Sequence, residues 1–132
     1  MEKIQNKKAK ISIIGMGYIG LPTATMFAST GYTVYGYDVN KEVIETLKRG
    51  KIHIVEPDLS GLFKSVLDSG NLIPTNKMIE SDVHIICVPT PFKEDHNEKK
   101  VDLSYVESAS EAVSKVLKKE PFQYHVYYEL FY

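Results

Sequence analysis

The sequence lacks the features that mark secreted, disulfide-bonded or membrane-spanning proteins. It contains a single cysteine, Cys87, so an internal disulfide framework is excluded and a reducing compartment is expected. No apolar run approaches the roughly 20 residues that span a bilayer. The apolar segment after the N-terminal lysines is only about five residues, too short for the core of a signal peptide. We therefore expect a cytoplasmic, soluble protein without a membrane partner.

An excess of charge is also missing. Sixteen basic residues stand against 17 acidic ones, for a net charge of −1. This balance carries no electrostatic footprint for nucleic acid, so no nucleic-acid partner is expected. The histidines and the cysteine have no metal-ligand spacing, and we predict no metal. At 132 residues the chain has the length of one domain.

What the sequence does contain is a regular alternation of predicted strands and helices. Short apolar runs predict strands over Ala9–Ile14, Thr33–Tyr37, Leu72–Thr75 and Val83–Val88. Apolar spacing predicts helices over Tyr18–Thr30, over Lys41–Arg49 (capped by Asn40), after Asp58 (as its cap) to about Ser69, and over Leu103–Lys119. Phe92–Lys100 is predicted as a charged loop, and Ser104 and Glu107 have capping-box spacing. The alternation favours a parallel sheet wrapped by helices on both faces.

The most informative motif follows the first predicted strand. It reads Gly15-Met16-Gly17-Tyr18-Ile19-Gly20, and the second strand ends at an acid, Asp38. This order of strand, glycine turn, helix, strand and acid predicts a dinucleotide-binding fold, a Rossmann-type doubly wound α/β sheet in three layers.

Each part of this motif has a physical task in such a fold. Gly15 permits the sharp turn, Gly17 lets a pyrophosphate approach the main chain, and Gly20 lets the helix pack closely on the sheet. The helix start offers unpaired N–H groups to an anion. Asp38 would accept hydrogen bonds from the adenosine ribose and repel a 2′-phosphate, so NAD is predicted rather than NADP. The alternatives are a tight turn without a ligand and, for Asp38, a helix cap.

Two further residues lie near the end of the fourth predicted strand. Thr90 follows the strand at the sheet edge where ligands bind in open parallel sheets. Its hydroxyl either contacts the cofactor or is satisfied within its own turn. Cys87 lies inside the apolar run, and we interpret it as a packing residue rather than a nucleophile.

Four segments resemble the UDP-glucose/GDP-mannose dehydrogenase family. They are the stretches Gly15–Ala24, Ile52–Leu59, Val88–Lys93 and Tyr105–Ala109. Together they resemble in particular the branch that oxidises UDP-N-acetyl-D-mannosamine. The resemblance covers about residues 10–119. It implies that Tyr18, Ile19, Asp38 and Thr90 hold NAD.

The resemblance also implies an activity for the full-length enzymes. They oxidise the C6 alcohol of a nucleotide sugar to a carboxylate with two NAD⁺ in succession, and a cysteine captures the intermediate aldehyde. Such uronic acid sugars serve surface polysaccharide synthesis. The family's catalytic lysine, nucleophilic cysteine, sugar-binding domain and dimer helix lie beyond the matching segment, so we assign no catalytic residue here. The UDP-sugar is expected as a partner of a full-length relative only.

The last residues depart from the family pattern. We divide the chain into an incomplete NAD-binding domain, 1–120, and an aromatic tail, 121–132. Our hypothesis is that a frameshift or premature stop has truncated the gene. The tail is aromatic enough for Phe122–Tyr128 to add to the sheet as a strand; left exposed, it would favour self-association.

Two alternatives remain open from the residues. Beside the nucleotide-sugar dehydrogenase interpretation, they are the cofactor domain of another β-hydroxyacid-type dehydrogenase, and a non-catalytic module that senses NAD or docks on a full-length dehydrogenase.

Overall fold

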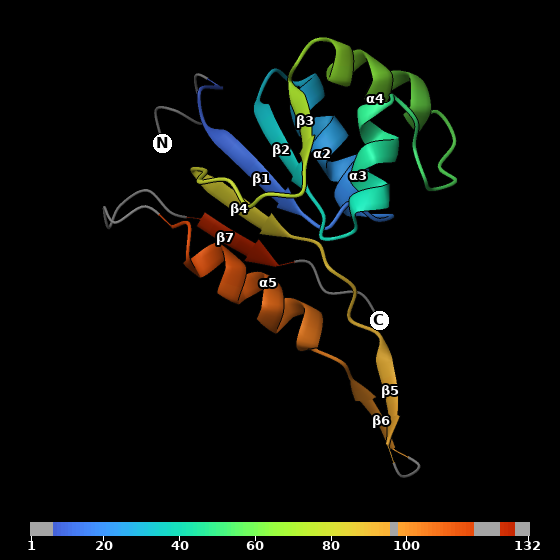
Figure 1. Cartoon of the computed structure of the whole chain (residues 1–132), viewed down its shortest axis with the longest axis vertical. Coiled ribbons are helices and arrows are strands. Elements are labelled where there is room, and N and C mark those ends of the chain that lie inside the picture. Colours follow the sequence, from blue (N-terminus) through green and yellow to red (C-terminus); the bar gives the residue numbers. More distant parts are fainter. Residues whose placement is uncertain (1–6, 96–97, 118–124, 129–132) are drawn as a thin grey trace.

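The centre of the molecule is a parallel sheet of five strands in the order β3-β2-β1-β4-β7 (Figure 1). This computed structural model describes residues 7–95, 98–117 and 125–128. The strands are β1 Lys10–Ile14, β2 Thr33–Tyr37, β3 Leu72–Thr75, β4 Val83–Ile86 and β7 His125–Tyr128. All four strand pairs in the sheet are parallel. The predicted Rossmann-type α/β fold is thereby confirmed.

Helices cover both faces of the sheet because successive residues of β1 point to opposite sides. Ile13 belongs to a core cluster with residues of the helices α2 (Gly20–Ser29), α3 (Lys41–Lys48) and α4 (Leu59–Asp68). Its neighbour Ile14 packs instead with α5 (Ser104–Ser114) on the other face. Figure 1 shows α5 beside β4 and β7, away from the other three helices. Two separate cores therefore fix the sheet from both sides.

The helix boundaries follow local signals in the sequence. Asn40 caps α3 as predicted, since its side chain accepts hydrogen bonds from the N–H groups of Glu42 and Val43. The chain leaves α2 through Gly31, whose φ of 105° is a left-handed conformation suited to glycine. The start of α2 differs from the prediction, because the helix begins at Gly20 rather than at Tyr18. The residues before it form the glycine turn.

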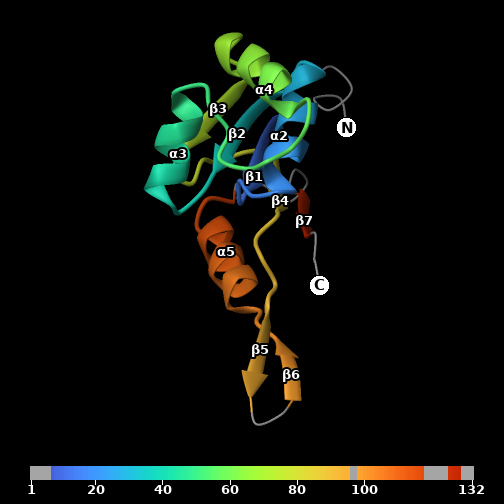
Figure 2. The ribbon, with the colours of Figure 1, turned by 90° about the vertical axis from the view of Figure 1, so that its right-hand side faces the viewer.

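The prediction of a loop over Phe92–Lys100 is wrong. This segment forms an antiparallel hairpin, β5 (Phe92–Asp95) and β6 (Glu98–Val101), that extends away from the sheet (Figure 2). Apolar residues stand opposite each other only at its base, where Phe92 pairs with Val101. Further out, Lys93 pairs with Lys100. Because the hairpin lacks the apolar alternation of a half-buried strand, the pattern indicated a loop.

The predicted capping box at the start of α5 is also wrong. The prediction paired Ser104 with Glu107. Instead, the carboxylate of Asp102, two residues before Ser104, accepts the N–H of Ser104 at 2.9 Å. An aspartate that bonds the N–H two residues on is a common local turn, and it competes with a Ser-based cap. Hydrogen bonds from Ser104 lower the pKa of the Asp102 carboxyl, with a smaller contribution from Lys93, whose Nζ lies 3.4 Å away.

The aromatic tail contributes one strand to the sheet. His125–Tyr128 forms β7 and pairs with β4 in parallel, which confirms the predicted strand over these four residues. The rest of the predicted tail, 121–124 and 129–132, lies outside the described residues, as do the last two residues of the helix predicted over Leu103–Lys119. No helix in the described part of the chain is long and apolar enough to span a membrane.

We predict that Asn40→Ala lowers the free energy of unfolding by about 1 kcal/mol, because two N–H groups at the start of α3 lose their acceptor. Urea denaturation followed by circular dichroism measures the change. Asn76→Ala is the matched control, since this exposed asparagine follows β3 outside any helix. Equal stability of the two variants would contradict the capping role.

Candidate functional site

The candidate residues meet at the edge formed by the carboxyl ends of the strands. The glycine turn follows β1, Asp38 follows β2, and the Pro89–Pro91 segment follows β4. Since β1 lies between β2 and β4 in the sheet, these three segments are neighbours. The chain covers one sheet face after β1 and the other after β4, so this edge is a topological switch point, where open α/β sheets bind ligands.

Two of the three motif glycines are required by the fold itself. Gly15 has a φ of 100°, and a Cβ there would lie 2.6 Å from the carbonyl oxygen of Cys87. A Cβ on Gly20 would lie 1.6 Å from the carbonyl oxygen of Gly15. Both contacts are with main-chain atoms that cannot easily move. These glycines therefore set how closely α2 approaches the end of β1.

Gly17 has no such reason within the protein. Apart from its two chain neighbours, no described residue has an atom within 4 Å of a Cβ at this position, and its φ lies outside the left-handed region. Neither packing nor backbone conformation calls for glycine there. A bare main chain that faces open space fits the close approach of a diphosphate. The turn thus has room for the dinucleotide that the motif predicts.

The start of α2 is suited to an anion. Its N-cap residue is Ile19, no side chain caps it, and its first turn carries no acid. The first backward hydrogen bond is from the N–H of Leu21 to the carbonyl of Gly17. The N–H groups before Leu21 have no carbonyl one turn earlier to bind, and the helix dipole is positive at this end. Tyr18 is 62% exposed beside them.

Asp38 is aimed at the glycine turn. One carboxylate oxygen accepts the N–H of Met16 at 2.9 Å, and the other accepts the N–H of Asn40 at 2.9 Å. The side chain that caps α3 is Asn40, so Asp38 does not serve as that cap. A carboxylate has about four acceptor positions. The half-buried Asp38 therefore retains capacity to accept hydroxyl groups from a ligand.

The remaining predicted positions, Cys87 and Thr90, are buried in the segment that follows β4. Cys87 is buried in the core cluster and its N–H binds the carbonyl of Ile14 at 2.7 Å, as expected of a packing residue. Thr90 is only 4% exposed in the segment after β4. Within the described residues, no group of three or more His, Cys, Asp or Glu side chains is placed to hold a metal ion.

Sequence reasoning missed a pocket beside the glycine turn. It has a volume of about 290 Å³ and lies between the ends of β1 and β2 and the first turns of α5, lined by Ile14, Tyr37, Val39, Tyr105, Ser108, Ala109 and Ala112. Val39 is 79% exposed and Tyr105 50% exposed, so both present apolar surface to solvent at this pocket. The only sequence signal was an apolar residue directly after Asp38, and such residues are common on protein surfaces.

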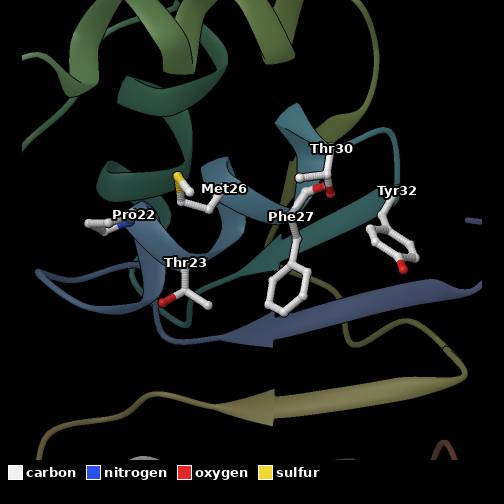
Figure 3. A pocket seen from close by; sticks show the side chains of 6 residues that line it. All are labelled: Pro22, Thr23, Met26, Phe27, Thr30 and Tyr32. Carbon is white, nitrogen blue, oxygen red and sulfur yellow. The ribbon is translucent and has the colours of Figure 1, made fainter. Parts of the chain in front are cut away.

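A second hollow, of about 450 Å³, lies along α2 and is lined by Pro22, Thr23, Met26, Phe27, Thr30 and Tyr32. Figure 3 shows Phe27 and Tyr32 extending from α2 and its following turn toward β1. Their rings meet edge to face at 6.1 Å between centroids. No lysine, arginine or acid lines this hollow, so it lacks the charged groups that recognise phosphate or ribose.

Comparison with known proteins identifies relatives of the chain. The NAD binding domain of the UDP-glucose/GDP-mannose dehydrogenase family matches residues 9–126. The UDP-N-acetyl-D-mannosamine dehydrogenase of Escherichia coli K12 is 50% identical over 111 residues, which is 84% of this chain and 26% of that protein. This chain therefore spans about a quarter of the length of that relative.

Solved structures agree with this comparison. The UDP-N-acetyl-mannosamine dehydrogenase of Staphylococcus aureus superimposes with a TM-score of 0.86 at 39% identity, over 92% of this chain and 29% of that one. The UDP-D-ManNAc dehydrogenase of Pyrococcus horikoshii gives a TM-score of 0.82 at 43% identity, over 92% and 28% of the two chains.

We predict that the motif glycines differ in their effect on stability. Gly20→Ala should lower the free energy of unfolding by about 3 kcal/mol or more, because its methyl group would overlap a main-chain carbonyl. Gly17→Ala should change it by less than about 0.5 kcal/mol, since nothing surrounds the new methyl group. Thermal and urea unfolding measure both variants. A loss of stability in Gly17→Ala as large as in Gly20→Ala would show that the fold, too, requires Gly17.

Proposed function

Because the chain belongs to the UDP-glucose/GDP-mannose dehydrogenase family through its NAD binding domain, we propose that it is the cofactor-binding part of a nucleotide-sugar 6-dehydrogenase. The substrate that the similarity favours is UDP-N-acetyl-D-mannosamine, since relatives named for it are 50% identical over most of this chain. The product would be the corresponding uronic acid sugar, used in surface polysaccharide. When bound, NAD supplies the hydride acceptor.

The observation that carries this proposal is the unexplained space at Gly17. The turn places the main chain of Gly17, Tyr18 and Ile19 at the open start of α2. These N–H groups would bind the diphosphate. The resemblance to the family implies that Tyr18 and Ile19, together with Asp38 and Thr90, hold the cofactor. Thr90, after β4, would contact the cofactor from the other side of the switch point.

The pocket next to Asp38 would take the adenosine end. Its walls are mostly apolar, with Val39 and Tyr105 available to cover a flat ring. Asp38 connects this pocket to the glycine turn. It directly follows Tyr37, which lines the pocket, and its carboxylate accepts the N–H of Met16 in the turn. A ribose there would meet a carboxylate. A 2′-phosphate in the same place would be repelled, which favours NAD over NADP.

This chain by itself should not oxidise the sugar. Aldehyde capture in such enzymes needs a nucleophilic thiol at the reacting carbon. The only cysteine of the sequence, Cys87, is buried beneath the glycine turn with its backbone bonded into the sheet. A buried thiol among apolar neighbours is a poor nucleophile. The chain's own contribution is to bind and orient the cofactor.

We predict that isothermal titration shows NAD binding at least about 100-fold tighter than NADP binding, because like charges placed together cost several kcal/mol. Asp38→Asn keeps the size of the side chain but removes its charge and one of its two acceptor oxygens, so the preference should fall to less than about tenfold. The control is AMP against 2′,5′-ADP, which carries the same phosphate difference. Equal affinity of the unchanged protein for both dinucleotides would refute the role of Asp38.

We also predict that the purified chain forms no measurable NADH from UDP-N-acetyl-D-mannosamine while it binds NAD. Absorbance at the NADH band measures the reaction, and a full-length relative serves as the positive control. Turnover by the purified chain, abolished by Cys87→Ser, would overturn the assignment of Cys87 as a packing residue.

A further inference from the structure

Met16 belongs to the glycine turn at the sheet edge, yet its side chain is buried in the core. It lies between two glycines of the motif, yet its side chain is only 1% exposed. It belongs to the core cluster that contains Ile13 and Leu72. The turn is therefore tied to the interior by one long side chain.

The room for this side chain is provided by Gly36, in the interior of β2. Glycine weakens a strand and calls for a reason, and the φ of Gly36 is not in the left-handed region. A Cβ at this position would lie 2.7 Å from the sulfur of Met16 and 3.5 Å from a methyl carbon of Leu72. The thioether of Met16 occupies the space that any side chain at position 36 would need.

The backbone of the same turn is held by the residues that follow Gly36. The carbonyl of Tyr37 accepts the N–H of Gly15 at 2.8 Å, and the carboxylate of Asp38 accepts the N–H of Met16 at 2.9 Å. Three successive residues thus hold the turn. Gly36 leaves room for the side chain of Met16, and Tyr37 and Asp38 each accept a hydrogen bond from the main chain of the turn. None of these contacts involves a ligand.

We propose that Gly36 is a positioning residue for the cofactor: it seats Met16, and the seated Met16 keeps the amides of Gly17, Tyr18 and Ile19 in the arrangement that receives the diphosphate. This inference rests on the proposed NAD binding. A side chain at position 36 displaces Met16, and the turn that carries it moves away from the carboxylate of Asp38. A site held in its binding conformation loses less freedom on binding, so displacement weakens affinity without touching a ligand atom.

A double-mutant cycle in NAD affinity tests the link between Gly36 and Met16. Gly36→Ala should weaken NAD binding about tenfold, the equivalent of roughly 1.4 kcal/mol, because the overpacked turn shifts. In a Met16→Ala background the same change should weaken binding by less than about twofold, since the overlap is gone. Gly61→Ala in α4 is the matched control, because its Cβ would meet nothing within 4 Å. Equal effects in both backgrounds would overturn the proposal.

Amide hydrogen exchange in the ligand-free protein separates this inference from the proposed function. The Met16 amide should be protected in the unchanged protein and should exchange at least about tenfold faster in Gly36→Ala, as its bond to Asp38 opens. If the unchanged protein binds no NAD, the proposed function fails while the exchange result still tests the anchor. A Gly36→Ala protein that melts earlier, yet keeps the protection of Met16 and full NAD affinity, would reduce Gly36 to a packing role.

If Gly36→Ala does not fold, substitutions of Met16 test the same anchor. Met16→Leu preserves most of the buried volume and should keep both NAD affinity and amide protection. Met16→Ala removes the anchor and should weaken NAD binding and amide protection about tenfold each, which leaves binding measurable. Identical behaviour of these two variants in both measurements would overturn the proposal.

Discussion

The contact between the first turn of α2 and the end of β1 determines where every other part of the site can lie. The Cα of Gly20 lies so close to the carbonyl of Gly15 that no side chain fits between them. This approach places the start of the helix directly over the strand end, with its unpaired N–H groups at the sheet edge. A wider turn would leave room for side chains but would carry these groups away from β2 and β4, where Asp38 and Thr90 lie.

The second strand contributes as much to the site as the glycine turn does. An acid that follows the second strand of such a fold, as Asp38 does, is usually interpreted as a ligand of ribose. In this structure it also holds the turn, through the N–H of Met16, and one carboxylate can do both because its two oxygens offer several acceptor positions. If Asp38 binds the ribose as we propose, one side chain links recognition of the ribose to the shape of the glycine turn. In the proposed complex, a change at Asp38 would affect the binding of both the adenosine ribose and the diphosphate.

Much of the fold could be predicted because the sheet is parallel and buried. Strands such as Thr33–Tyr37 and Leu72–Thr75 have the predicted bounds, since β-branched and aromatic runs between glycines and helix caps leave little choice. The hairpin at Phe92–Val101 could not be recognised, because its stability depends on main-chain pairing rather than on an apolar face. At the start of α5, Asp102 and Ser104 are both residue types that accept a hydrogen bond from the first N–H groups of a helix. The sequence alone does not decide which of them does so.

The glycine motif likewise predicted where the site lies but not why each of its glycines is needed. Its three glycines are identical in the sequence, yet Gly15 and Gly20 are required by main-chain contacts within the fold, whereas none of the described residues requires Gly17. Only the structure distinguishes a glycine that the fold requires from one that a ligand requires. The atoms that decide this are main-chain atoms of Cys87, which is distant in the sequence, and of Gly15, whose position depends on the shape of the turn. The pocket lined by Val39 and Tyr105 could not be predicted for the same reason, since these residues are far apart in the sequence and come together only in the fold. A glycine that the fold does not need is therefore stronger evidence for a ligand than the motif in which it stands.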